Sequence, residues 1–169
     1  MATEHRKLSR WGVGPVLAIL TVGYTGAVLG ISRLLPIRMI IPIQKPEVPW
    51  ISLVLFAIGI PFLIISLFEL HRAYGAGKLV TTGVFSLCRN PIYSSWNLLL
   101  VPATVLLLRN WLCLTIPFFM YGLLRALIKK EEEYLSISFG EAYERYKMDV
   151  FFILPLSPLF RRRKDRSTL

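Results

Sequence analysis

The sequence has few charged residues and few of the side chains that most often bind metals. Charged residues make up 18% of its 169 positions, whereas an ordinary soluble domain has about 25%. Its two cysteines, Cys88 and Cys113, fit no metal-binding spacing, and neither an H-E-x-x-H nor a C-x-x-C motif occurs. A disulfide scaffold is therefore excluded, and the sequence predicts no metal site.

Apolar residues are abundant instead. They account for 54% of the chain without counting glycine, and the mean hydropathy is +0.56. This content excludes a disordered chain and exceeds that of a typical soluble domain. The formal net charge is +10, from 20 basic and 10 acidic residues. A basic balance suits nucleic acid or an anionic membrane surface, and the apolar content favours the membrane.

Four apolar stretches are long enough to cross a bilayer as helices, which takes about 17–25 residues. They are residues 13–35, 49–68, 92–108 and 111–128. Only Arg109-Asn110 separates the last two, so a tight antiparallel hairpin is expected. Buried helices of a soluble protein would show a polar face, which these stretches lack. We therefore predict one all-α membrane domain over residues 1–169, a helical bundle with four transmembrane helices.

The first span contains three glycines at helical spacing. Gly26 and Gly30 form a G-x-x-x-G motif, and Gly23 lies one turn earlier. Small residues let membrane helices approach closely. We expect these glycines to pack within the bundle rather than to drive homodimerisation.

The basic residues are unevenly distributed between the two membrane sides. The side with both termini carries Arg6, Lys7, Arg10, Arg72, Lys78, Arg89 and nine more from Lys129 onward. The other side holds Arg33, Arg38, Lys45 and Arg109. The positive-inside rule places both termini in the cytoplasm. We expect the basic tail, residues 161–169, to bind anionic lipid headgroups, and we expect no nucleic-acid partner.

The polar segment before the third span contains groups that suit an anionic ligand. Gly83 predicts a turn, Pro91 fits the first helical turn, and Asn90 is a plausible N-cap. The helix N-terminus and the Arg89 guanidinium both favour a carboxylate. Tyr93, one turn into the helix, is placed to stack on a ligand. The alternative is a capped interfacial helix with an arginine–lipid contact.

The segment after the fourth span is rich in carboxylates. We expect the fourth helix to continue past the membrane, which puts Arg125, Glu132 and Phe139 on one face at intervals of seven. The adjacent carboxylates of 131–133 repel one another. At least one should pair with a cation such as Arg125, Lys129 or a ligand ammonium.

A break in the helix is expected at Gly140, because glycine favours helix ends. Tyr143 and Tyr146 would then lie on a short amphipathic piece that can fold back as a lid. The two polar segments together offer a cation for a carboxylate, carboxylates for an ammonium and tyrosines for a flat ring. This set matches a zwitterionic cofactor with a purine, such as S-adenosylmethionine.

Two strings in these segments resemble known motifs. Arg89-Asn90-Pro91-Ile92-Tyr93 resembles R-H-P-x-Y, and the string from Glu131 to Tyr146 resembles E-E-x-x-L-x-x-x-F-G-x-x-Y-x-x-Y. Both motifs are found in integral-membrane methyltransferases, a family that includes isoprenylcysteine carboxyl methyltransferases and, more distantly, phospholipid amine methyltransferases. The resemblance covers roughly residues 79–155. It implies an enzyme that methylates a lipophilic small molecule or lipid-linked group.

The resemblance also implies a cofactor site at the cytosolic membrane face, built from the loop before the third helix and the extension after the fourth. The implied catalytic residues are Arg89, Arg125 and Glu132. The implied S-adenosylmethionine-binding residues are Leu79, Val80, Gly83, Asn90, Pro91, Tyr93, Glu131, Glu132, Leu135, Tyr143 and Tyr146. No metal is implied.

The sequence departs from the family pattern in two places. Asn90 stands where the family has histidine, so it can donate a hydrogen bond but cannot act as a titratable base. The family's V-P-R-x-x-P ending is Val150-Phe151-Phe152-Ile153-Leu154-Pro155, without the arginine. Two alternatives follow: a non-catalytic membrane scaffold, and a relative of NADPH-dependent sterol reductases, whose chains are longer.

Overall fold

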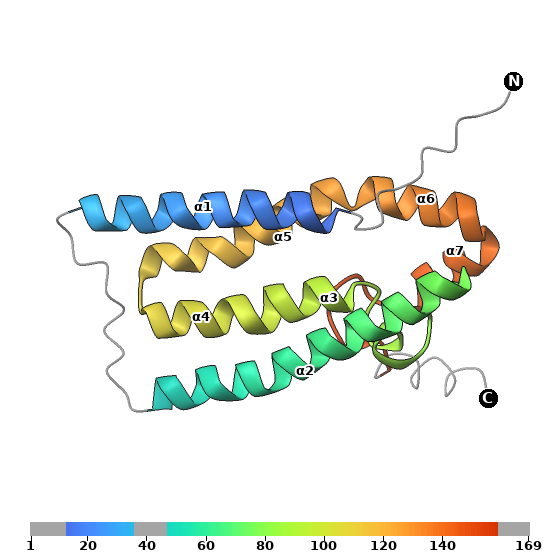
Figure 1. The fold of residues 1–169 in the computed structure, drawn as a ribbon, viewed down its shortest axis with the longest axis horizontal. Coiled ribbons are helices and arrows are strands. Elements are labelled where there is room, and N and C mark those ends of the chain that lie inside the picture. Colours follow the sequence, from blue (N-terminus) through green and yellow to red (C-terminus); the bar gives the residue numbers. More distant parts are fainter. Residues whose placement is uncertain (1–12, 36–46, 159–169) are drawn as a thin grey trace, which may run out of the picture.

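The computed structural model describes residues 13–35 and 47–158, and every element in these ranges is a helix (Figure 1). The first two spans are α1 (Gly14–Leu34) and α2 (Glu47–Ala76). The third is α3 (Pro91–Ser94), the π-helix η2 (Ser95–Leu100) and α4 (Val101–Leu108). The fourth is the short 3-10 helix η3 (Trp111–Leu114) with α5 (Thr115–Leu127). The prediction of a helical bundle is confirmed.

Three of these helices have the length and composition to cross a membrane, and a bent pair of helices is a candidate for a fourth crossing. Residues 14–34, 47–73 and 91–108 meet the criteria alone. Residues 111–127 meet them together with α6 (Lys129–Phe139), at an angle of 41°. The chain then turns into α7 (Glu141–Asp149), while η1 (Gly83–Ser86) lies in the loop between α2 and α3.

The helices pack in the order α1, α5, α4 and α2, each antiparallel to the next (Figure 1). The expected tight hairpin joins α4 to η3. Arg109 takes a left-handed backbone conformation at φ 53°, and the Asn110 side chain accepts a bond from the Leu112 N–H at 2.9 Å. The Asn110 amide also donates to the Ser32 hydroxyl near the end of α1. This turn ties α1, α4 and η3 together at one end of the bundle.

α2 packs against the third span through a row of small residues. Ser52, Gly59 and Ser66 are spaced by seven, and all three are buried. Both hydroxyls donate to carbonyls within α2, at 3.1 and 2.6 Å, so they present little polarity to the neighbouring helix. A Cβ at Gly59 would lie only 2.8 Å from Leu100 of η2. The row therefore permits a close helix approach, as small residues do in membrane proteins.

A π-helical turn interrupts the third span just before Pro102. Proline has no backbone N–H and its ring crowds the carbonyl four residues earlier, which disfavours a continuous α-helix there. Beside this turn, the buried Asn97 side chain donates to the Pro117 carbonyl of α5 at 2.9 Å. A polar side chain inside the apolar bundle thus gains a partner on the neighbouring helix.

The expectation that the glycines of the first span pack within the bundle is wrong. Gly23, Gly26 and Gly30 are exposed on α1, and a Cβ at any of them would meet nothing within 4 Å. α1 instead contacts the bundle through Leu17 and Val28, which lie on its opposite side and belong to two apolar clusters. Larger side chains make more contact with α5 and η3. The face of α1 with Leu17 and Val28 therefore packs against the bundle in preference to the glycine face.

We predict opposite effects for Gly59→Ala and Gly26→Ala. The first adds a methyl group where Leu99 and Leu100 leave no space, and overpacking costs about 1–3 kcal/mol. The second adds one in open space on a helix, where alanine is favoured over glycine by about 1 kcal/mol. Thermal unfolding in one detergent should show a lower midpoint for Gly59→Ala and an equal or higher one for Gly26→Ala. Equal midpoints for Gly59→Ala and the parent protein would contradict the close approach.

Candidate functional site

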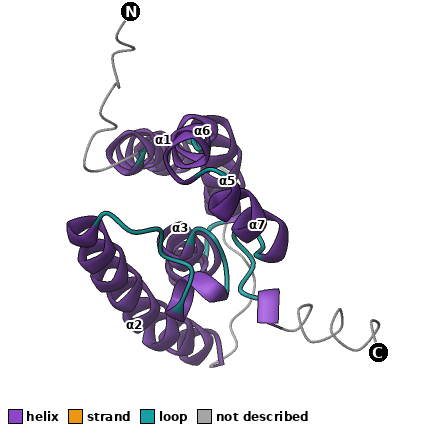
Figure 2. Cartoon of the chain, turned by 90° about the vertical axis from the view of Figure 1, so that its right-hand side faces the viewer, coloured by secondary structure: helices purple, strands orange, loops and turns teal. Residues whose placement is uncertain are grey.

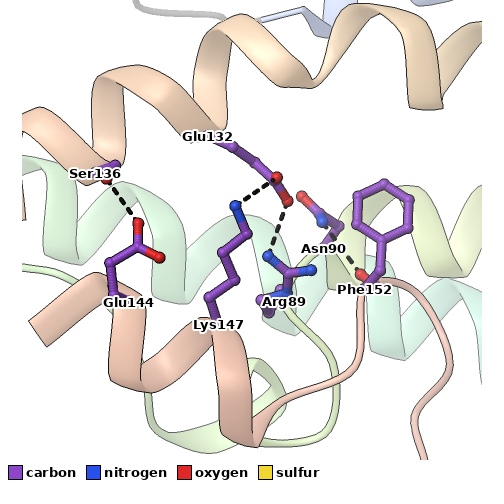
Figure 3. A network of polar contacts seen from close by, with 7 residues as sticks. All are labelled: Arg89, Asn90, Glu132, Ser136, Glu144, Lys147 and Phe152. Atoms are coloured by element: carbon purple, nitrogen blue, oxygen red, sulfur yellow. Dashed lines mark hydrogen bonds and ion pairs between the residues drawn. The ribbon is translucent and has the colours of Figure 1, made fainter. Parts of the chain in front are cut away.

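The helices α6 and α7 lie at one end of the bundle, which faces the viewer in Figure 2. A network of charged side chains lies at this end (Figure 3). Glu132 of α6 is its centre. Its Oε1 accepts a bond from the Arg89 Nη1 at 2.8 Å, and its Oε2 pairs with the Lys147 ammonium at 3.3 Å. The side chains of Arg89, Glu132 and Lys147 are 11%, 18% and 38% exposed. The network thus joins the loop before α3 to α6 and α7.

Backbone hydrogen bonds fix the position of Arg89. Its N–H donates to the Phe151 carbonyl at 2.8 Å, and the Asn90 N–H donates to the Phe152 carbonyl at 3.2 Å. The Phe151 N–H in turn donates to the Ser157 hydroxyl at 2.8 Å. The segment after α7 therefore runs beside the start of the third span and fixes the backbone from which the Arg89 side chain extends.

Asn90 has a different role from the one expected. Pro91 does occupy the first helical turn, as predicted, but the Asn90 side chain makes no capping bond to α3. Its amide donates to the Phe152 carbonyl at 3.1 Å (Figure 3). The side chain thus bonds to a neighbouring segment through its NH2 group, and its oxygen does not accept a bond from the helix N–H groups.

Two guanidinium groups lie against the ring of Phe152. The Cζ atoms of Arg125 and Arg89 lie 4.8 and 5.7 Å from the ring centroid, which is within cation–π range. One of the three adjacent carboxylates does pair with cations, as expected, but the partners of Glu132 are Arg89 and Lys147 rather than Arg125 or Lys129. Phe152 stands where the resembled motif has arginine. This departure is the only feature of the sequence that points to a role for position 152.

The two tyrosines of α7 are buried in a small apolar cluster. Tyr143, Tyr146 and Val150 pack with the partly buried Leu79, Leu135 and Phe139. The Tyr146 hydroxyl donates to the Phe85 carbonyl at 2.7 Å. Burial raises the pKa of both phenols, that of Tyr143 to about 12, with a further rise from Glu132 and an opposing effect of Arg89. Both hydroxyls are thus protonated at neutral pH.

The predicted helix break at Gly140 is confirmed. Gly140 has φ 53° and ψ −131°, a conformation that a side chain would strain, and it ends α6 and begins α7. The Ser136 hydroxyl donates to the Glu144 carboxylate at 2.7 Å across the turn. α7 consequently folds back along α6 and brings Tyr143 and Lys147 to Glu132.

Other residues implied by the motifs lie apart from this network. Glu131 points toward the start of α1, where its carboxylate accepts a long bond from the Val13 N–H at 3.4 Å. Tyr93 packs with the cluster of Leu17, Met120 and Leu124. The motifs therefore supply two groups of residues, of which only one surrounds Glu132.

The loop that carries Leu79, Val80 and Gly83 is fastened to α2 by Glu69. The Glu69 carboxylate accepts a bond from the Val84 N–H at 3.1 Å. Gly83 has φ 60°, and a Cβ there would overlap the Glu69 carboxylate. Val80 is half-buried in the same loop. The anchoring role of Glu69 has no signal in the sequence, because its partner is a backbone N–H.

Cysteine and metal chemistry receive no support from the geometry. Cys88 and Cys113 are free and buried, and burial raises the pKa of the Cys88 thiol to about 11, which keeps it protonated. Within residues 13–35 and 47–158, no three His, Cys, Asp or Glu side chains are grouped to hold a metal. Comparison of the chain with protein-family models, curated proteins and solved structures found no match.

We expect Glu132→Ala to destabilise the protein much more than Glu141→Ala. The first leaves the nearly buried guanidinium of Arg89 without a carboxylate, and breaking a buried pair costs about 3–5 kcal/mol, somewhat less here because water reaches Lys147. The second breaks the Glu141–Arg145 pair, whose side chains are 79% and 72% exposed. Thermal unfolding of both variants tests this, and similar midpoints would show that the Glu132 network contributes little.

Proposed function

We propose that this protein is an integral-membrane methyltransferase that transfers a methyl group from S-adenosylmethionine to a lipophilic acceptor. The main support is the ion pair between Arg89 and Glu132, which are 43 residues apart in sequence. It joins the two segments whose motifs resemble those of membrane methyltransferases, and it lies beside Tyr143 of the second motif.

The network has groups that suit both ends of an amino acid. Glu132 can accept a bond from an ammonium group. The Nε of Arg89 is buried and has no hydrogen-bond partner. An unpaired buried donor is unfavourable, and a ligand carboxylate would satisfy it through a charge-assisted bond. The amino-acid part of S-adenosylmethionine carries both groups, so it fits the polarity of this network.

The bound cofactor would supply a methyl group on a positively charged sulfur. The residues of this chain would orient the two reactants and exclude water, which are the main contributions to such a transfer. Asn90 cannot titrate, and the Tyr143 phenol, with its pKa raised to about 12, does not accept protons at neutral pH. These groups favour an acceptor that is already an anion, such as a carboxylate or thiolate. A phospholipid amine would first have to lose a proton.

The orientation in the membrane supports access for a lipophilic acceptor. The charged network lies at the end of the bundle where α2 ends, α3 begins and α6 extends beyond the spans (Figure 1). The positive-inside rule, applied to the basic residues that flank these helices, supports a cytoplasmic position of that end. An acceptor with an apolar tail in the bilayer would then reach the site from the membrane.

A non-catalytic membrane scaffold is the second candidate. Its support is that the network leaves little room for a ligand: both oxygens of Glu132 are paired, and Tyr143 and Tyr146 are only 3% and 8% exposed. Such a scaffold would keep the fold and bind no cofactor.

Calorimetric titration with S-adenosylhomocysteine, using the protein in nanodiscs, separates these two candidates. We expect saturable binding at one site. Glu132→Gln should weaken it about 10- to 100-fold, because a charge-assisted hydrogen bond contributes about 1.5–3 kcal/mol. Glu141→Gln, which changes an exposed glutamate of α7, should bind as the parent does. If the folded parent protein binds no S-adenosylhomocysteine, the methyltransferase proposal fails, and titration with NADPH then tests a reductase.

A further inference from the structure

Lys147 is the least firmly held member of the Glu132 network, and neither motif includes it. Its ammonium lies 3.3 Å from Oε2 of Glu132, compared with 2.8 Å between Arg89 and Oε1. Its side chain is 38% exposed, whereas that of Arg89 is 11% exposed. The two carboxylate oxygens of Glu132 thus have partners of very different accessibility.

We propose that Lys147 is an internal competitor of the ligand. Its ammonium occupies the oxygen of Glu132 that a ligand ammonium would take, and a zwitterionic ligand displaces it into water. This inference rests on the proposed function, because it takes the amino-acid part of S-adenosylmethionine as the ligand.

Arg89 is not suited to such an exchange. Its backbone is bonded to Phe151, its guanidinium lies against the Phe152 ring, and the side chain is nearly buried. Releasing Oε1 of Glu132 would therefore leave a buried guanidinium without its carboxylate, which is strongly unfavourable. Oε1 is a permanent contact, and only Oε2 is available to a ligand.

Lys147 is suited to it. A lysine ammonium is a strongly hydrated point charge on a flexible stem, so it can leave Glu132 for water at little cost. The incoming ammonium has the same charge and the same kind of N–H donors. Glu132 is neutralised to the same extent before and after the exchange, and no carboxylate is left unpaired at any stage.

The exchange requires only the Lys147 side chain to move. α7 itself is anchored by the buried rings of Tyr143 and Tyr146, and the Tyr146 hydroxyl is bonded to the Phe85 carbonyl at 2.7 Å. The Ser136–Glu144 bond holds α7 to α6 as well. The helix can therefore remain in place while the side chain swings out.

This competition affects ligands according to whether they carry an ammonium group. S-adenosylhomocysteine has one and must displace Lys147. Methylthioadenosine has the same purine, ribose and thioether but no amino-acid group, so it has nothing to place at Oε2. Lys147 should therefore lower the affinity for the first ligand and leave the second unaffected.

Isothermal titration of four proteins in nanodiscs tests the inference. They are the parent, Lys147→Met, Lys147→Arg and Arg145→Met. Lys147→Met removes the competing charge and should tighten S-adenosylhomocysteine binding about threefold to tenfold, as expected when a competing state is removed. Lys147→Arg should weaken it, because a guanidinium is more weakly hydrated than an ammonium and leaves the carboxylate for water less readily. Arg145→Met removes an exposed cation of the same helix and should change nothing.

The outcomes distinguish this inference from the proposed function. If the parent binds S-adenosylhomocysteine and Lys147→Met binds it equally or more weakly, Lys147 is not a competitor and only this inference fails. Tightening of methylthioadenosine binding by Lys147→Met to the same degree would also overturn it. If none of the four proteins binds S-adenosylhomocysteine although all show cooperative thermal unfolding, the proposed function fails together with the inference.

Discussion

The structure at the end of the bundle that carries α6 and α7 depends on the ion pair between Arg89 and Glu132. Both side chains are largely withdrawn from water, and a charge in that position is stable only with a partner. The loop before α3 must therefore meet α6. Because the Arg89 backbone is also bonded to Phe151, the segment after α7 is held in the same place. One electrostatic requirement thus orders three segments that are distant in sequence.

The apolar bundle makes this meeting possible. The turn at Arg109-Asn110 returns the chain at once, so α3 begins and α5 ends at the same end of the bundle (Figure 1). The bond from Asn97 to the Pro117 carbonyl joins the two halves of this hairpin within the bundle. The small residues of α2 then bring a third helix close to it. Short connections and close packing leave the charged segments little freedom in how they approach.

The sequence was sufficient to predict the helices, the tight hairpin and the break at Gly140, because these depend on local signals: apolar length, a two-residue connection and a glycine. It was insufficient for the partners of Glu132. Three adjacent glutamates and several lysines and arginines permit many pairings, and the 41° bend between α5 and α6 changes the relative orientation of side chains on the two helices. The outward orientation of Gly26 and the anchoring role of Glu69 likewise depend on packing against other helices.

The phenylalanine at position 152 is consistent with the charges around it. Glu132 already lies between the cations Arg89 and Lys147, and Arg125 lies nearby against Phe152. An arginine at position 152, as in the resembled motif, would add a further positive charge next to a single paired carboxylate. The Phe152 ring instead attracts the two guanidiniums through its face, without adding charge. The ion-paired group of Arg89, Glu132 and Lys147 thus has two cations for one carboxylate, and Phe152 adds no third charge to it.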